Sequence, residues 1–370
     1  MTTAAKGLSD FDKHQKFVIL LLAFLQFTVQ LDFSILAPLG AIIMPALKIS
    51  AGQFGLLVSG YAFAAGISGF LTAGFADKFD RKFLLMIFYA GFLIGTFLCA
   101  LADSFEFLLF ARVLSGLFGG VVSSIIFTIA ADLFPLEQRG RVIGTIQSSW
   151  GASVVFGLPL GLYLSGLFGW HSIFYMNVYL IILVGFALVC FLEPITEHLA
   201  RAKTGKNAFR RLFDALARPR YLQAYATAGL VVTGSYMLMP FGSAYSVNNL
   251  GLDIALLPVF YIITGGVSLI LSPRIGKLSD KIGKFKTFTI GTCIGMVMIF
   301  IYTHLGVSPF YVLLLVTIFN QSSVAARLIT GSALGSAVPD VEHRGAFMSV
   351  NSSLQQVSGG IAAGRPRRAA

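Results

Sequence analysis

The chain has 370 residues, of which 56% are hydrophobic and only 12% are charged, against about 25% in soluble domains; its mean hydropathy is +0.82. This small number of charged side chains cannot cover the apolar surface of a soluble fold. The composition therefore excludes a soluble globular protein. The net charge of +11 does not indicate a nucleic-acid partner, because the charges lie in segments between apolar runs, which indicates a lipid bilayer as partner.

Eleven apolar runs are long enough to cross a bilayer, whose apolar core of about 30 Å needs about 20 helical residues. The runs are continuous rather than alternating, which favours helices over a transmembrane barrel. The sequence therefore predicts an all-α membrane protein. The expected spans are 17–44, 52–76, 83–102, 105–131, 142–167, 172–192, 221–247, 254–273, 287–304, 308–337 and 346–363.

Lysine and arginine are strongly biased to one side of these spans. Every second segment between spans is rich in lysine and arginine, above all 193–220. The other segments between spans contain a single basic residue of this kind, Lys48. Because cytoplasmic segments carry the excess of positive charge, we expect a cytoplasmic N-terminus. The predicted location is the cell's plasma or inner membrane, with multiple spans.

Two pairs of short segments are alike, which indicates an internal repeat. Segment 73–82 (AGFADKFDRK) resembles 276–285 (GKLSDKIGKF), and residues 135–140 reappear as 339–345 at nearly the same separation. Such a repeat is typical of transporters made of two halves related by an axis along the membrane normal. We expect two pseudo-symmetric six-helix bundles, the second lacking its last helix.

The repeat also sets the expected boundaries. It places the partner of 172–192 beyond the last residue, so we expect a chain truncated in its eleventh span, with a natural eleven-span variant as the alternative. The divisions are an N-terminal six-helix bundle at 1–192, a basic cytoplasmic linker at 193–220, a C-terminal bundle of five spans at 221–363 and an atypical basic tail at 364–370.

One pair of opposite charges lies inside the spans. Apart from Glu106 at the start of the span at 105–131, Asp32 is the only acidic residue in a predicted span, and Arg112 lies about two turns into the span at 105–131. Charge inside a bilayer is costly, so both are expected to face the interior and to meet in the outer half. We expect Asp32 to exchange a proton and Arg112 to tune its pKa; a static buried ion pair is the alternative.

The glutamines of the first span face another way. Gln26 and Gln30 lie more than about 100° from Asp32 on a helical wheel. Either these glutamines line a cavity and Asp32 faces a partner helix, or the reverse holds.

The two basic turns fit the pattern G-x-L-A-D-R-x-G-R-K, and the segment from Arg112 to Gly119 fits R-x-x-x-G-x-x-G. With these motifs, the chain resembles the major facilitator superfamily, and within it the twelve-span drug/proton antiporters and sugar-efflux permeases. The resemblance implies a cytoplasmic gate, in which a carboxylate faces the positive N-terminus of a helix in the other half; merely basic turns are the alternative. The implied gating residues are Asp77, Lys78, Arg81, Lys82, Gly276, Asp280, Lys281, Gly283, Lys284, Arg139 and Arg344.

By this resemblance, Asp77 would face the start of the eleventh span near Gly345, and Asp280 the start of the fifth near Arg141. Ala73 and Asp80 stand where the family pattern has glycines, so the first turn is expected to be less flexible.

The fifth span carries small residues at a spacing of four. Gly157 and Gly161 present bare backbone for close packing, and Pro159 between them should loosen one turn. The stretch resembles the superfamily's antiporter motif, in the order G-x-P-x-G that looks more like the sugar-efflux branch. It therefore favours efflux.

Isolated polar residues inside spans are candidates for a substrate cavity, although each alone more often forms an interhelical hydrogen bond. Arg327, in the tenth span, is either a cytoplasmic-end residue or a substrate contact. The candidates are Gln26, Gln30, Gln147, Tyr236, Asn248, Asn320, Gln321, Asn351 and Gln355.

The motifs indicate a secondary transporter that works by alternating access on a small-molecule substrate, with protons as the coupling ion. We expect proton-coupled efflux; proton-linked or facilitated uptake, and a transport-inactive truncated protein, are the alternatives. The sequence contains no nucleotide-binding, metal-binding or catalytic motif, so we expect no cofactor, no metal and no enzyme activity. We expect a monomer.

Overall fold

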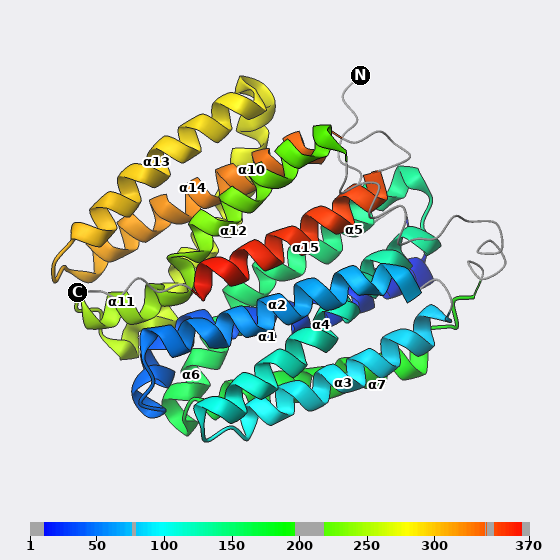
Figure 1. Cartoon of the computed structure of the whole chain (residues 1–370), viewed down its shortest axis with the longest axis horizontal. Helices are drawn as coiled ribbons and strands as arrows, with labels where there is room; N and C mark the ends of the chain where they lie inside the picture. The colour runs from blue at the N-terminus through cyan, green and yellow to red at the C-terminus, as the bar shows by residue number, and fades with distance from the viewer. Residues whose placement is uncertain (1–10, 76–78, 197–217, 337, 339–343, 365–370) are drawn as a thin grey trace.

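The computed structural model describes residues 11–75, 79–196, 218–336, 338 and 344–364. Regular structure in these residues is helical, and most of the helices are long and run roughly alongside one another (Figure 1). Nine helical segments in the described part of the chain are long and apolar enough to cross a membrane. The prediction of an all-α membrane protein is confirmed.

The first half of the chain forms a bundle in which α2 and α3 pack on α4, and α7 packs on α3 and α1. Its elements are α1 (Lys13–Ala46), α2 (Ala51–Phe75), α3 (Arg81–Ala100), α4 (Phe105–Leu133), α5 (Leu136–Ala152), a π-helical turn (Ser153–Gly157), α6 (Leu158–Phe168) and α7 (His171–Phe191).

In the second half, α13 packs on α14, α12 on α14, and α10 on α15. Figure 1 shows α13 and α14 at the edge of the molecule opposite α3 and α7. The elements are α10 (Pro219–Tyr236), a 3₁₀ turn (Met239–Phe241), α11 (Gly242–Asn248), a 3₁₀ turn (Ile254–Leu256), α12 (Leu257–Ile282), α13 (Lys284–His304), α14 (Phe310–Ser336) and α15 (Arg344–Ala363).

Two predicted spans are interrupted at proline. The span predicted at 221–247 stops at Tyr236 and continues through a 3₁₀ turn that contains Pro240. The span predicted at 142–167 passes through the π-helical turn just before Pro159, which has no N–H to donate to the carbonyl of Val155. Hydropathy alone did not show these breaks, because proline leaves an apolar run apolar.

The two halves touch near the end of the bundle that carries Lys48. There the hydroxyl of Ser243 donates to the carbonyl of Ala37 at 2.6 Å, and the rings of Phe54 and Phe241 lie 6.1 Å apart. By the charge rule this end is predicted to face outward. Ala37 and Ser243 also line the cavity described below, so this contact between α1 and α11 bounds the cavity toward its predicted outer end.

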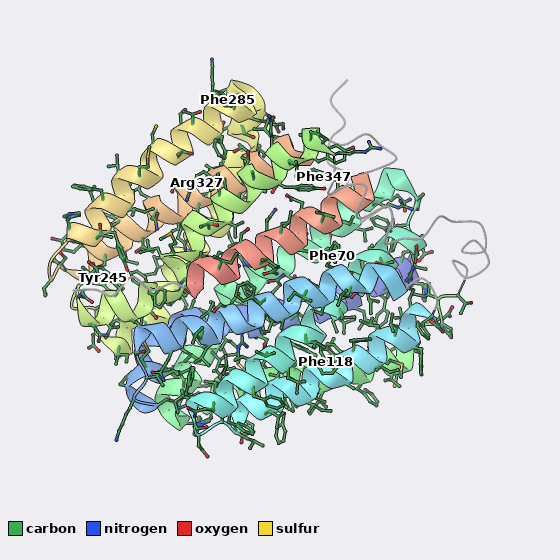
Figure 2. The ribbon with its side chains drawn as sticks, in the orientation of Figure 1. Phe70, Phe118, Tyr245, Phe285, Arg327 and Phe347 are labelled. Atoms are coloured by element: carbon green, nitrogen blue, oxygen red, sulfur yellow. The ribbon has the colours of Figure 1, made fainter. Side chains whose placement is uncertain are left out.

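A second contact between the halves lies toward the other end of α2. Phe70 of α2 packs against the cluster of Tyr221, Tyr225 and Phe347, and Figure 2 labels Phe70 and Phe347 on the neighbouring helices α2 and α15. The rings of Tyr225 and Phe347 are stacked with centroids 4.8 Å apart. Helices α2 and α15 are thus joined along much of their length.

The glycines after Arg112 explain the close packing of α4 on α2. A Cβ atom at Gly116 would lie 2.5 Å from the carbonyl oxygen and 2.9 Å from the Cα of Tyr61. Because backbone atoms cannot move aside as a side chain can, only glycine fits there. The R-x-x-x-G-x-x-G pattern therefore fixes the distance between α2 and α4.

Replacing Gly116 by alanine is expected to destabilise the fold by about 1–3 kcal/mol, because the added methyl group overpacks the α2–α4 contact. The matched control is Gly166→Ala in α6, where an added Cβ has no described atom within 4 Å. The control should keep its stability or gain up to about 1 kcal/mol from better helix propensity. Melting temperatures in detergent compare the two; equal values for Gly116→Ala and wild type would contradict the packing argument.

Candidate functional site

Asp32 and Arg112 form an ion pair inside the first half of the chain. Nη1 of Arg112 donates to Oδ2 of Asp32 at 2.8 Å and to the main-chain oxygen of Asp32 at 3.1 Å. The side chains are 0% and 1% exposed, respectively. The structure thus brings together the two charges that the sequence placed in different spans.

Three further helices surround the pair. Thr96 of α3 donates to Oδ1 of Asp32 at 3.1 Å, and Asn177 of α7 approaches the same oxygen at 3.5 Å. The ring of Tyr61, on α2, covers the guanidinium of Arg112 with its centroid 4.3 Å from Cζ, a cation–π arrangement. The ion pair therefore links all five helices α1, α2, α3, α4 and α7.

The sequence analysis missed Thr96, Asn177 and Tyr61. Threonine and tyrosine are common in apolar spans and carry no signal alone. Asn177 carried one, since it is an amide inside the predicted span 172–192. The three residues lie far apart in the chain, so only the fold shows that they meet at one carboxylate.

A cavity of about 330 Å³ lies between the halves. It takes its walls from α1, α5, α6, α10, α11, α12, α13, α14 and α15 and from the short turns next to α6 and α11. Phe33 and Ser34 line it, directly after Asp32 in the chain, whereas Asp32 faces the other helices of its own half. Asp32, the candidate for proton exchange, is thus next to cavity-lining residues in the chain but does not line the cavity itself.

Neither Asp32 nor the glutamines of α1 line the cavity. Its lining there consists of Phe33, Ser34, Ala37 and Pro38, whereas Gln26 is buried in the first half with Oε1 lacking a described hydrogen-bond partner. Asp32 faces partner helices, as the first alternative expected, but the glutamines do not line the cavity, because a third face of α1 is turned to the other half.

The remaining polar candidates divide into two groups. Gln147, Asn248, Asn351 and Gln30 do not belong to the cavity lining. The candidates that do line it are Tyr236, Asn320, Gln321 and Gln355, and Arg327 joins them. Gln356 lines it too and was missed.

The first basic turn fastens elements of the first half to one another. Asp80 caps α3 and accepts from the main-chain N–H groups of Lys82 at 2.8 Å and Ile195 at 3.1 Å. Nε of Arg81 donates to Asp132 of α4 at 3.0 Å, and Arg81 is 2% exposed. Asp80, where the family pattern has glycine, is therefore a cap that also holds the segment after α7.

Two more predicted gate residues bond within the first half. Nζ of Lys82, in the first basic turn, donates to the carbonyl of Val189 at 3.1 Å, and Nε of Arg139, at the start of α5, donates to the carbonyl of Phe134 at 2.8 Å. Asp77 and Lys78 lie outside the described residues, as do the side chains of Arg141 and Arg344. A gate contact of Asp77 thus stays a prediction.

The second basic turn is not the loop that the sequence predicted. Helix α12 continues through Gly276, Asp280 and Lys281 as far as Ile282, and α13 begins at Lys284. Gly283 alone makes the reversal, with φ at +98°, which only glycine adopts without strain. Asp280 is 71% exposed and pairs with Lys284 at 3.3 Å.

In the fifth span, the small residues face two different helices. A Cβ at Gly157 would lie 2.6 Å from Leu31 of α1, whereas at Gly161 it would overlap Ile173 of α7. Pro159 lies in the first turn of α6, directly after the π-helical turn. The expected loosening of one turn at Pro159 is thus present as this π-helical turn.

Comparisons with known proteins agree with this architecture. The model of the Major Facilitator Superfamily matches residues 22–363. The uncharacterized MFS-type transporter YwfA of Bacillus subtilis (strain 168) is 28% identical over 323 residues, covering 85% of this chain and 76% of that protein. Multidrug resistance protein 3 of the same organism is 32% identical over 197 residues, 53% of this chain but 37% of that protein.

Solved structures show the same fold. A bacterial homologue of the human lysosomal transporter Spinster, inward-facing and unoccupied, superposes with a TM-score of 0.77 at 18% identity, covering 95% of this chain and 82% of the other. The xylose transporter XylE from E. coli, in a partially occluded inward-open conformation, gives 0.73 at 14% identity, with 95% and 90% covered. The family match, the helical architecture and the cavity between the halves together place the chain in the major facilitator superfamily, as a multi-pass secondary transporter of a small molecule rather than an enzyme.

Proposed function

We propose that this transporter exports its substrate in exchange for protons, and that Asp32 takes up and releases the coupled proton. The observation that carries the proposal is the buried ion pair of Asp32 with Arg112, directly beside a cavity of transport-site size. An ionisable residue inside a membrane is expensive, so its retention there favours a role in proton movement over a packing role.

The surroundings of the pair suit both protonation states of Asp32. When Asp32 is ionised, Arg112, Thr96 and Asn177 all donate toward its carboxylate. When Asp32 is protonated, Arg112 retains its hydrogen bond to the main-chain oxygen of Asp32 and its cation–π contact with the ring of Tyr61. Oδ1 of Asn177 has no hydrogen-bond partner among the described residues, so it is free to accept the new O–H.

Helix α1 provides the link between proton and substrate. Phe33 contacts Tyr61 on one side, with centroids 5.5 Å apart, and Tyr236 of the second half on the other, at 6.1 Å. Ala37, further along α1, accepts the hydrogen bond from Ser243 that joins the halves. A shift of α1 on protonation of Asp32 therefore reaches both the cavity wall and the predicted outer closure.

Export rather than uptake is favoured by the resemblance of the fifth span to the antiporter motif and by the similarity to multidrug resistance protein 3. The proton gradient supplies the driving force, because each proton moved is worth about 2.3 kcal/mol per 100 mV. Uptake with protons is the competing direction, and the same flux measurement distinguishes the two.

The pair should show strong energetic coupling. Arg112→Gln leaves Asp32 buried without its cation, and Asp32→Asn leaves Arg112 without its anion, so each single variant should lose about 3–5 kcal/mol of stability. The double variant removes both charges and should be markedly more stable than the sum of the two losses predicts. Melting temperatures of the wild type, the two single variants and the double variant in neutral detergent solution complete this double-mutant cycle. Additive losses would show that the two charges do not interact.

Transport should depend on Asp32. In everted membrane vesicles acidified inside by respiration, a panel of toxic compounds is added one at a time while an internal dye reports pH. The wild-type protein should release protons from the vesicle when a transported compound enters. Asp32→Asn should reduce this release to the background of vesicles without the protein. Asp103→Asn, on a carboxylate that is 93% exposed, is the control and should behave as wild type.

Three results would contradict the proposal. Full proton release by Asp32→Asn would remove Asp32 from the coupling. Protons that move in the same direction as the compound would indicate uptake. No proton release with any compound in the wild-type protein would favour an inactive transporter.

A further inference from the structure

We infer that the cavity binds an organic anion with an apolar body, and that Arg327 is the counter-ion of its acidic group. This inference rests on the proposed function insofar as the cavity is the transport site. It names the substrate class, which neither the ion pair at Asp32 nor the superfamily defines.

Arg327 is the only formally charged side chain among the described residues that line the cavity. It is half-buried, and its Nε has no hydrogen-bond partner among the described residues. No described carboxylate forms an ion pair with it, in contrast to Arg112, which has Asp32 at 2.8 Å. The second half therefore presents an uncompensated cation to the cavity.

An unpaired charge in a low-dielectric site is unfavourable, and a bound anion removes that cost. Guanidinium also matches the planar geometry of a carboxylate, with which it forms two parallel hydrogen bonds. A cationic substrate would meet repulsion from Arg327, because the described lining offers no acidic group in exchange. The charge of the cavity thus selects for anions and against cations.

The glycines of α13 leave space beside Arg327. Gly291 and Gly295, four residues apart, let α13 approach α14 closely; a Cβ at Gly295 would lie 4.0 Å from Cζ of Arg327. On α14 the cavity residues Asn320, Val324 and Arg327 recur every three or four positions, so they share one helical face. Figure 2 shows Arg327 on α14, where that helix lies beside α13.

The rest of the cavity fits an apolar body. Phe33, Trp150, Phe260 and Tyr261 line it together with aliphatic side chains, and amides such as Asn320 and Gln355 add hydrogen-bonding groups. A volume of about 330 Å³ is at the small end of the range for ligand sites. The combination fits a small aromatic or aliphatic acid, whose body contacts the apolar side chains while its polar substituents reach the amides and hydroxyls of the lining.

Trp150 provides a direct readout, because it lines the cavity and is 45% exposed, whereas the other tryptophan, Trp170, is 6% exposed. Three nitroaromatic quenchers of nearly equal size serve as probes: 4-nitrobenzoate, 4-nitrobenzamide and 4-nitrobenzylammonium. Each is titrated against the purified full-length protein in detergent while tryptophan fluorescence is recorded. The Trp150→Phe variant supplies the correction for quenching of Trp170 and for light absorbed by the probe.

The wild-type protein is expected to bind 4-nitrobenzoate at least about tenfold more tightly than the amide, and the ammonium compound more weakly still. Arg327→Gln should reduce this preference to about onefold, and Arg327→Lys should retain part of it, because the charge remains while the planar fork is lost. The control Arg274→Gln makes the same substitution on α12 at an exposed arginine outside the cavity lining, and should leave the preference unchanged.

Equal binding of the benzoate and the amide by the wild-type protein would overturn the inference, as would an absence of saturable quenching by the benzoate. An Arg327→Gln protein that keeps the preference would overturn the role of Arg327. The wild-type comparison needs no variant, so it decides the substrate class even where a variant fails to fold. Because this measurement uses no proton gradient, its failure leaves the coupling at Asp32 standing, and the failure of coupled flux leaves the anion preference standing.

Discussion

The attraction between one carboxylate and one guanidinium, both removed from solvent and from lipid, organises the first half of this transporter. Asp32 and Arg112 are each almost fully buried, and further side chains around them come from α2, α3 and α7. A charge in an apolar protein interior is tolerated only with an opposite charge and hydrogen-bond partners of this kind. The packing of these helices therefore also positions the groups of the site. The glycines of α4 allow α2 to pack closely against it.

The two halves use their intramembrane charges differently, although their sequences repeat. The first half encloses its arginine with an acidic partner, whereas the second half presents Arg327 to the cavity without one among the described residues. The basic turns differ in the same way. Asp80 caps α3 and binds the N–H of Ile195, while at the equivalent reversal Gly283 supplies only a left-handed backbone. Similar sequences thus mark corresponding positions without giving corresponding contacts.

The sequence predicted the helical class, the bounds of most spans to within a few residues and the meeting of Asp32 with Arg112, because hydropathy and the cost of isolated charge act over single helices. It predicted a loosened turn at Pro159, but neither the break at Pro240 nor the helical course of α12 through Asp280, since these depend on local backbone bonding. Nor did it predict which face of α1 lines the cavity. That choice depends on the rotation of α1 against the second half. Hydrophobic periodicity does not give this rotation in a membrane helix, because the sides that face lipid and the sides that face protein are both apolar.

The central claim is that Asp32 changes protonation state while it remains in its shell. Infrared difference spectroscopy between acidic and alkaline solution, with Asp32→Asn to assign the carboxylic C=O band, measures this directly. If Asp32 is protonated and deprotonated in place, this band titrates in the wild-type protein, is absent from Asp32→Asn and changes when a ligand occupies the cavity. A carboxylate that stays ionised throughout the pH range in which the protein transports would contradict the central claim.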